Sequence, residues 1–253
     1  MRIHAVPAFQ DNYLWLIEDG RHAAVVDPGD AKPIEEALAS RGLELTAILA
    51  THHHGDHVGG LRELAAHWRC PVLGPAHEAI GGLTQTLVEG ERIKVPGLDA
   101  SFSVLDVPGH TSGHIAYVGD DVAFVGDTLF ACGCGRLFEG TPEQMADSLG
   151  KLAKLPPTTR AYCAHEYTMA NIRFAEAVEP GNARLHERKA RDAAKRQRGE
   201  PTVPSTIGDE LATNPFLRCS EPEVIASAER HAGRKLAGPV AVFAEIRAWK
   251  NSF

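Results

Sequence analysis

The chain has 253 residues, of which 43% are hydrophobic and 23% charged, and its formal net charge is -7. This length and composition fit a globular protein with one large or two smaller domains, and the acidic balance argues against nucleic acid as a main partner. No apolar run is long enough to span a bilayer, so no membrane partner is expected.

The first two thirds of the sequence predict a mixed α/β layer architecture. Residues 13–17 and 23–29 are predicted as paired strands around a turn, and a helix is predicted over 32–42. An apolar strand over 45–52 runs into a histidine-rich stretch, and a helix follows over 58–68. Further strands are expected at 71–74, 92–95, 102–109, 122–127 and 160–166.

The pattern changes near residues 166–170, where we place a domain boundary. An α/β domain is expected over 1–167 and a small α-helical domain over 168–253. Its predicted helices cover 169–200, with a break at Pro180-Gly181, and then 221–233 and 238–253. The Pro-rich stretch 201–216 between them is predicted as a loop.

A basic stripe marks the first long helix of this second domain. Its members have spacings that share one face, and acidic neighbours dilute it. We interpret the stripe as a solvated helix face, with an acidic partner as the alternative. It consists of Arg184, Arg188, Arg191, Lys195 and Arg198.

The stretch THHHGDH at residues 51–57 holds four histidines and one aspartate directly after an apolar strand. In an extended chain alternate residues point the same way, so His52 and His54 can converge on one metal ion. A glycine then lets the chain turn sharply, so Asp56 and His57 can reach a second point nearby. One short loop therefore offers two pairs of ligands, as a two-metal site requires.

Three more candidate ligands stand at the C-terminal ends of other apolar strands: His110, Asp127 and His165. Ligand sites of α/β proteins gather at such strand ends. Five histidines and two aspartates are too many ligands for one tetrahedral ion, but they suit two ions that share a bridging ligand. Asp127 is the natural bridge, because its carboxylate has two oxygens. Imidazole with carboxylate suits zinc, iron or manganese. His114 is expected to make a hydrogen bond within its loop, and His53 is expected to be a structural or solvated neighbour of the ligands.

Several motifs together resemble a known family. THHHGDH, PGHTSGH, VGDTLF and AHEYT are similar to the metallo-β-lactamase superfamily. DNYLWLI, GCGRLFEG, RAYCAHEYTMANIRFA, VEPGN, GEPTVPST and NPFLR resemble the narrower glyoxalase II (hydroxyacylglutathione hydrolase) family. The resemblance runs nearly end to end, so it covers both expected domains.

The resemblance implies an αββα sandwich, the catalytic domain, followed by an α-helical domain that helps to bind glutathione. It implies one metal ion held by His52, His54 and His110, a second held by Asp56, His57 and His165, and Asp127 as the bridge, with zinc as the expected metal. It also implies substrate-binding roles for Arg136, Phe138, Tyr167, Arg247 and Lys250.

Two positions depart from the family's pattern. Phe138 stands where several relatives have tyrosine, so one hydroxyl contact to the substrate is missing. Ala164 replaces a usual glycine before His165, which shifts the expected local backbone. Neither departure changes a metal ligand.

The implied reaction is hydrolysis of S-(2-hydroxyacyl)glutathione thioesters, from S-D-lactoylglutathione to D-lactate and glutathione, the second step of methylglyoxal detoxification. A metal-bound hydroxide would attack the thioester carbonyl, and Asp56 would accept a hydrogen bond from it. The alternatives are another hydrolase of the same scaffold, a persulfide dioxygenase with a single iron, and a metal- or RNA-binding protein without hydrolysis.

The remaining expectations concern compartment and assembly. Residues 1–17 have no clean apolar core and no cleavage pattern, so we expect mature, cytoplasmic protein. Five cysteines, an odd number, fit reduced thiols better than disulfides. Cys132 and Cys134 are too closely spaced for a usual structural zinc pair, so we interpret them as small buried residues in a turn. A monomer is expected.

Overall fold

The computed structural model describes residues 1–253, which divide into two compact units. The first unit comprises Met1–Asp106 and Thr111–Gly126, and the second comprises Val107–His110 and Asp127–Phe253. None of the helices combines the length and the apolarity that crossing a membrane requires.

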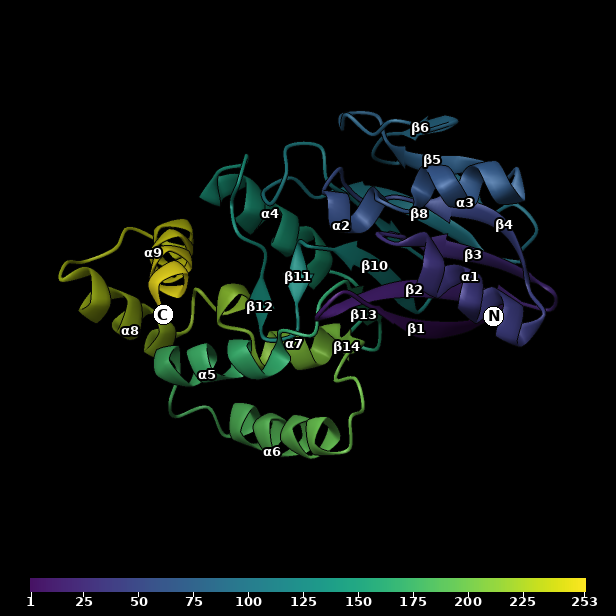
Figure 1. The fold of residues 1–253 in the computed structure, drawn as a ribbon. Helices are drawn as coiled ribbons and strands as arrows, with labels where there is room; N and C mark the ends of the chain where they lie inside the picture. The colour runs from purple at the N-terminus through teal and green to yellow at the C-terminus, as the bar shows by residue number, and fades with distance from the viewer. The chain divides into compact units, whose positions relative to one another are not determined.

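A six-stranded sheet forms the larger part of the first unit (Figure 1). Its first three strands pair antiparallel and the remaining pairs are parallel. In order, the strands are β1 (Arg2–Ala8), β2 (Asn12–Asp19), β3 (His22–Val26), β4 (Glu44–Leu49), β5 (Val72–Pro75) and β6 (Gln85–Leu87). The parallel register pairs Val26 with Leu49, so the residues that follow β3 and β4 emerge at the same edge of the sheet.

Two helices, α1 (Ala31–Arg41) and α3 (Leu61–Trp68), cover this sheet (Figure 1). Their buried leucine and isoleucine side chains form one core with the inward side chains of β2, β3 and β4. The helix expected over 58–68 is split, because α2 (Gly55–Val58) ends at Gly59 and α3 begins after Gly60. A Cβ on either glycine would lie within 2.5 Å of neighbouring backbone, so this junction is closely packed.

Four antiparallel strands complete the first unit: β7 (Arg92–Lys94), β8 (Ser101–Asp106), β9 (Ile115–Val118) and β10 (Val122–Gly126). The sequence analysis did not propose β9. Tyr117 of β9 is fully buried, and its hydroxyl donates to the carbonyl oxygen of Ala50 at 2.8 Å. This bond links β9 to Ala50, which follows β4 and directly precedes the histidine-rich stretch.

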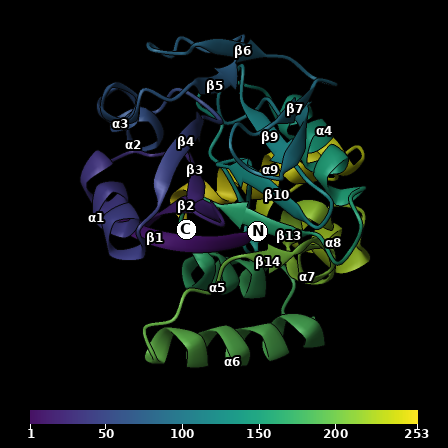
Figure 2. The same cartoon turned by 90° about the vertical axis from the view of Figure 1, so that its right-hand side faces the viewer.

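The second unit contains two strand pairs and most of the helices. β11 (Leu129–Phe130) pairs with β12 (Gly133–Cys134), and β13 (Arg160–Cys163) pairs with β14 (Ser205–Thr206). α5 and α6 lie side by side in both views (Figure 2), and the break expected at Pro180-Gly181 separates them. The helices are α4 (Pro142–Ala153), α5 (Thr168–Val178), α6 (Ala183–Gln197), α7 (Ile207–Thr213), a 3-10 turn η1 (Pro215–Leu217), α8 (Pro222–Ala232) and α9 (Pro239–Ser252).

The prediction of a loop over 201–216 is wrong, because this stretch contains β14, α7 and η1. The prolines at its start suggested a loop, but Thr206 caps α7 through a 3.0 Å bond from the amide of Asp209. Asn214 likewise caps η1 by accepting from the amide of Phe216 at 3.1 Å. The short helix therefore depends on caps that periodicity alone does not reveal.

The basic stripe on α6 is also not a uniform solvated face. The side chain of Arg184 is 69% exposed, but that of Arg188 is only 2% exposed. The Arg188 side chain points into the protein, where its guanidinium binds the buried carboxylates of Asp192 and Glu210. The interpretation as a solvated stripe is therefore wrong for this residue.

Candidate metal centre

His52 and His54 converge, as the alternation of the extended chain predicts. His52 Nε2 lies 3.1 Å from His54 Nδ1, and His52 is fully buried. His114, expected to make a hydrogen bond within its loop, stacks on His52 with ring centroids 4.6 Å apart and is equally buried. The first half of the histidine-rich loop therefore presents two imidazoles to one point.

Asp56 and His57 form the second pair of the loop. His57 Nε2 lies 3.7 Å from Asp56 Oδ2. Asn12, at the start of β2, donates from Nδ2 to the same Asp56 oxygen at 3.0 Å. The Asn12 amide thus fixes the orientation of the half-buried carboxylate.

Asp27, which sequence reasoning missed, binds two residues of the histidine-rich loop, Thr51 and His57. It follows β3, is 3% exposed, and accepts from the amide of Thr51 at 2.7 Å and from the Thr51 hydroxyl at 2.7 Å. Its Oδ2 also lies 3.1 Å from His57 Nδ1. A carboxylate on Nδ1 makes that nitrogen the donor and directs the lone pair of Nε2 outward, as metal-binding histidines require. The signal was present, since Asp27 ends an apolar strand in the same way as the predicted ligands.

Glu78 is a second residue that sequence reasoning missed. Its side chain is 1% exposed, and Oε1 accepts from the Thr111 hydroxyl at 2.6 Å and from the Gly113 amide at 2.9 Å. Oε2 accepts from the amide of His53 at 3.1 Å and also contacts Nδ1 of that ring. One buried carboxylate thus joins the loop after β4 to the loop before β9. No local pattern marks it, because all its partners are distant in sequence.

In the second unit, Asp127 faces two histidines. Its Oδ2 lies 3.4 Å from Nε2 of His110 and 3.4 Å from Nε2 of His165. The carbonyl oxygen of Arg136 lies 2.8 Å from His110 Nδ1, which makes Nδ1 the donor and turns Nε2 toward Asp127. All three proposed ligands are at most 7% exposed. This carboxylate therefore lies between two of the proposed ligands.

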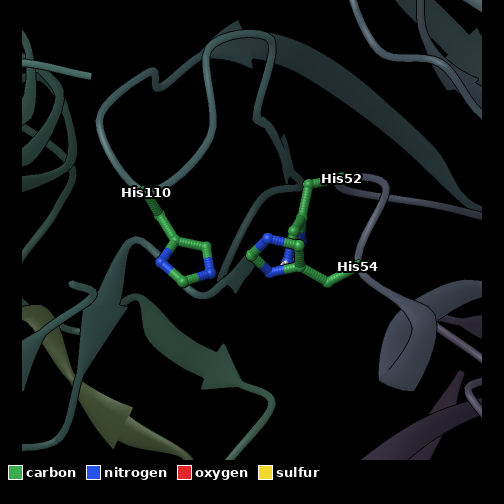
Figure 3. Close-up of side chains that lie close together, drawn as sticks. All are labelled: His52, His54 and His110. Atoms are coloured by element: carbon green, nitrogen blue, oxygen red, sulfur yellow. Dashed lines mark hydrogen bonds between the residues drawn. The ribbon is translucent and has the colours of Figure 1, made fainter. Parts of the chain in front are cut away.

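The ligand atoms of the predicted residues fall into groups that could each hold a metal ion. His52, His54 and His110 form one group (Figure 3), and Asp56, His57 and His165 form another, each with its ligand atoms within 4.8 Å of one another. Asp27, His52 and His57 satisfy the same distance, but both Asp27 oxygens are already occupied by Thr51. The cluster of imidazoles and carboxylates suits a dinuclear metal site.

Three candidate substrate-binding side chains lie at the surface of the second unit. Arg136 is exposed, Phe138 is 62% exposed and Tyr167 is 36% exposed. Two of these rings contact proposed ligands. Tyr167 stacks on His165 with ring centroids 4.7 Å apart, and Phe138 meets the His110 ring edge-on with centroids 5.2 Å apart. A substrate that contacts these rings would therefore lie next to the ligands.

Arg247 and Lys250 of α9 lie deeper than a solvated helix end. Arg247 is 5% exposed and donates to the Cys134 carbonyl oxygen at 2.9 Å, and Lys250 donates to the Ala170 carbonyl oxygen at 3.3 Å. Burial, and then the positive charge of Arg247, lower the pKa of Lys250 to about 8. Nε of Arg247 is buried without a hydrogen-bond partner.

All five cysteines are buried and free. Burial raises the pKa of Cys132 and of Cys163 to about 12, so neither thiol supplies a thiolate near neutral pH. The interpretation of Cys132 and Cys134 as small buried residues in a turn agrees with their places beside and in β12.

Comparison with known proteins defines the family. The metallo-beta-lactamase superfamily model matches residues 9–165, and the model of the hydroxyacylglutathione hydrolase C-terminus matches residues 166–253. A hydroxyacylglutathione hydrolase of Alkalilimnicola ehrlichii is 61% identical over 251 residues, 98% of each chain.

Two solved structures share the fold. ETHE1 from Myxococcus xanthus is 25% identical with a TM-score of 0.68, and the alignment covers 100% of this chain and 99% of that one. A protein solved in a di-iron-bound form is 27% identical with a TM-score of 0.59, covering 86% of this chain and 100% of that one. The expected fold, a metallo-β-lactamase α/β core with a C-terminal helical domain, is confirmed. The chain belongs to the hydroxyacylglutathione hydrolase family within the metallo-β-lactamase superfamily.

Proposed function

We propose that this protein hydrolyses S-(2-hydroxyacyl)glutathione thioesters, with S-D-lactoylglutathione as the substrate and D-lactate and glutathione as products. The observation that carries the proposal is the 61% identity with a hydroxyacylglutathione hydrolase over almost the whole of both chains. In the reaction, water adds its oxygen to the acyl carbon as the C–S bond breaks, and the sulfur leaves as the thiol of glutathione. This reaction is the second step of methylglyoxal detoxification.

The proposed site would hold two zinc ions. His52, His54 and His110 would hold one, Asp56, His57 and His165 would hold the other, and Asp127 would serve both. The two 3.4 Å contacts of Asp127 Oδ2 support the bridge, and the di-iron form of a relative supports a dinuclear arrangement on this fold. When bound, the metal pair would lower the pKa of a water molecule and polarise the thioester carbonyl.

The protein's own residues prepare this chemistry. The Arg136 carbonyl oxygen holds His110 Nδ1, and Asp27 holds His57 Nδ1, so each ring offers Nε2 as an acceptor. Asp56, which Asn12 orients, is proposed to accept a hydrogen bond from the attacking water. No thiol or hydroxyl nucleophile is needed, in keeping with the raised pKa of the buried Cys163.

Recognition of glutathione is assigned to cationic and aromatic side chains. Glutathione carries two carboxylates, and this acidic protein must meet them with local positive charge. Arg136, Arg247 and Lys250 supply the charge, and Phe138 and Tyr167 supply apolar contact. We propose that residues 168–253 form the glutathione-binding domain and residues 1–167 the catalytic domain.

We further propose a monomer located in the cytoplasm. The five free cysteines support a reducing compartment, because such thiols persist where disulfides are not formed.

The test compares substrates and counts metals in one preparation. The purified protein is assayed with S-D-lactoylglutathione, by loss of the thioester, and with a β-lactam at equal concentration. Rapid turnover of the thioester alone and about two metal equivalents per chain are expected, since the seven proposed ligands serve two ions. Equal or better turnover of the β-lactam would overturn the assignment. One saturating equivalent of iron with persulfide consumption would identify the protein as a dioxygenase.

A further inference from the structure

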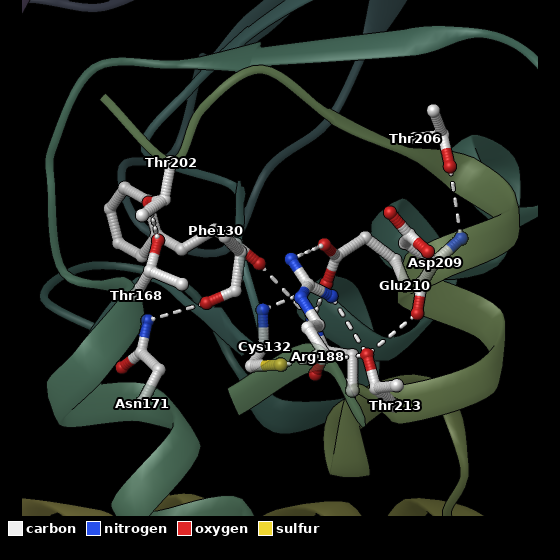
Figure 4. Close-up of polar contacts among 12 residues, drawn as sticks. Phe130, Cys132, Thr168, Asn171, Arg188, Thr202, Thr206, Asp209, Glu210 and Thr213 are labelled. Atoms are coloured by element: carbon white, nitrogen blue, oxygen red, sulfur yellow. Dashed lines mark hydrogen bonds and ion pairs between the residues drawn. The ribbon is translucent and has the colours of Figure 1, made fainter. Parts of the chain in front are cut away.

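A cluster of buried charges that includes none of the proposed ligands lies at the contact of α6 and α7 (Figure 4). The guanidinium of Arg188 donates to Glu210 Oε1 at 2.7 Å, to the Thr213 hydroxyl at 2.7 Å and to Asp192 Oδ2 at 3.3 Å. All four side chains are at most 2% exposed. An ion pair buried to this degree contributes little net stability, because desolvation offsets its attraction. Net stability alone therefore does not account for the cluster.

The cluster continues into the backbone of β11, β12 and the residues around them, which we name the 129–136 segment. Glu210 Oε2 accepts from the Cys132 amide at 2.9 Å and from Asn214 Nδ2 at 2.9 Å. Asn214 in turn donates to the carbonyl oxygens of Phe130 at 3.2 Å and Gly133 at 2.9 Å. One carboxylate oxygen thus serves Arg188, and the other holds the segment.

The backbone at Cys132 needs this support. Its φ is +55°, in the left-handed region that residues with a side chain seldom adopt. Such a conformation persists only where surrounding contacts enforce it. Buried side chains supply those contacts at the neighbouring residues as well, since Asn171 donates to the Ala131 carbonyl oxygen at 3.0 Å and Arg247 to that of Cys134 at 2.9 Å.

The segment ends at a residue of the proposed site. The Gly135 amide donates to the Thr128 carbonyl oxygen at 3.2 Å, and Arg136 follows with its side chain exposed and its carbonyl oxygen on His110 Nδ1. A Cβ on Gly135 would lie 2.0 Å from the Asp127 carbonyl oxygen, so the chain passes tightly against the base of a proposed ligand. Displacement of the Cys132 turn would therefore move the Arg136 side chain.

We propose that Arg188 and Glu210 are positioning residues that set the place of Arg136 and thereby the preference for thioesters that carry glutathione. The inference rests on the proposed function. Arg188 aligns Glu210 by donating to Oε1 at 2.7 Å, and Glu210 Oε2 holds the Cys132 turn. Only a carboxylate can accept from Arg188 with one oxygen and from the Cys132 amide with the other, because both of its oxygens accept hydrogen bonds.

Two variants test the role, Glu210→Gln and Arg188→Lys. The amide of glutamine has one accepting oxygen, so it can serve Arg188 or the Cys132 turn but not both. Lysine keeps the charge of Arg188 but cannot reproduce the planar fork that reaches three acceptors. Lys189→Met is the matched control, since Lys189 follows Arg188 on α6 and its ion pair with Glu176 of α5 lies at the surface.

The measurement is the ratio of two kcat/KM values, for S-D-lactoylglutathione and for the D-lactoyl thioester of N-acetylcysteamine, a neutral thiol. A merely structural lesion lowers both values alike and leaves the ratio unchanged. We expect each variant to lower the ratio at least about tenfold through the KM for the glutathione thioester, as loss of one charge-assisted contact would. Metal content should stay within about twofold of that of the native protein, and any fall in kcat should be shared by both substrates and leave the ratio unaffected. The control should match the native protein.

An unchanged ratio in either variant, or a variant that no longer folds, would overturn the inference and leave the cluster a purely structural element. Failure of the native protein to hydrolyse S-D-lactoylglutathione is a separate outcome, because it refutes the proposed function itself. The native measurement is made first, so the two failures are distinguishable.

Discussion

Asp27 and His57 lie 30 positions apart in the sequence, and Oδ2 of the first is 3.1 Å from Nδ1 of the second. The parallel register of β3 with β4 creates this approach, because it places the end of β3 beside the start of the histidine-rich loop. Asp27 also binds the amide and the hydroxyl of Thr51. A single buried carboxylate thus fixes both the start of the loop and the tautomer of one proposed ligand.

Replacement of Asp27 by asparagine should weaken metal binding. The asparagine oxygen can keep the Thr51 amide, but its NH₂ group would face His57 Nδ1 and favour the tautomer that carries a proton on Nε2. Loss of such an orienting partner typically lowers metal affinity about 10–100-fold. Competition with a chelator measures the affinity, and excess metal should restore activity. Asp120→Asn, in the exposed turn before β10, is the control, and equal affinities in two folded variants would contradict the role.

Asp127 should matter for both metal ions, whereas His54 should matter for one. Asp127 Oδ2 faces both His110 and His165, so Asp127→Ala removes a ligand from each proposed ion. We expect its metal content to fall below about one equivalent, and that of His54→Ala to stay near one, from about two in the native protein. Elemental analysis after reconstitution gives the counts. Similar losses in both variants would argue against the bridge.

The proposed metal ligands could be predicted because each lies in a segment that follows an apolar strand, and such strands are visible in the sequence as apolar runs. The orientation of the His57 and His110 rings could not, since it depends on Asp27 and on the Arg136 carbonyl oxygen, which are distant in sequence. The mixed α/β layer architecture followed from alternating apolar runs, whereas the αββα sandwich was implied only by the family resemblance. Strand β9 and helix α7 did not, because β9 is short and α7 depends on its caps. The burial of Arg188 was hidden in the same way, because helical spacing does not reveal a carboxylate on another helix.

Arg136→Ala should impair binding and spare the chemical step. A charge-assisted contact to a glutathione carboxylate is worth about 1.5–3 kcal/mol, so KM should rise at least about tenfold, which corresponds to about 1.4 kcal/mol. The carbonyl oxygen that holds His110 belongs to the backbone and survives the change, so kcat and metal content should be retained. Arg184→Ala, at the exposed start of α6, serves as the control. A fall in kcat at constant KM would show that Arg136 acts in the reaction instead.

Lys250 allows a test through folding stability alone. Its pKa of about 8 in the folded protein lies below the ordinary 10.5, so the unfolded chain binds more protons between these values. The cost of keeping this buried ammonium charged is fully present below about pH 8 and is relieved as the pH rises toward about 10.5. Lys250→Met should therefore gain most in Tm over the native protein near pH 7, and the gain should shrink by pH 10. A constant difference would contradict the lowered pKa.

Binding of S-methylglutathione, which has the carboxylates of the substrate and no thioester, tests whether Lys250 also meets the ligand. Arg247 is unsuited to truncation, because it holds the Cys134 carbonyl oxygen. Above about pH 8 the native Lys250 loses its charge, so the Kd should rise by up to about tenfold per pH unit. Lys250→Arg stays charged over this range and should lack that rise, while any titration of the ligand itself affects both proteins equally. Calorimetry from pH 7 to pH 9.5 gives both curves. Parallel curves would remove Lys250 from the glutathione site and leave its lowered pKa a consequence of burial alone.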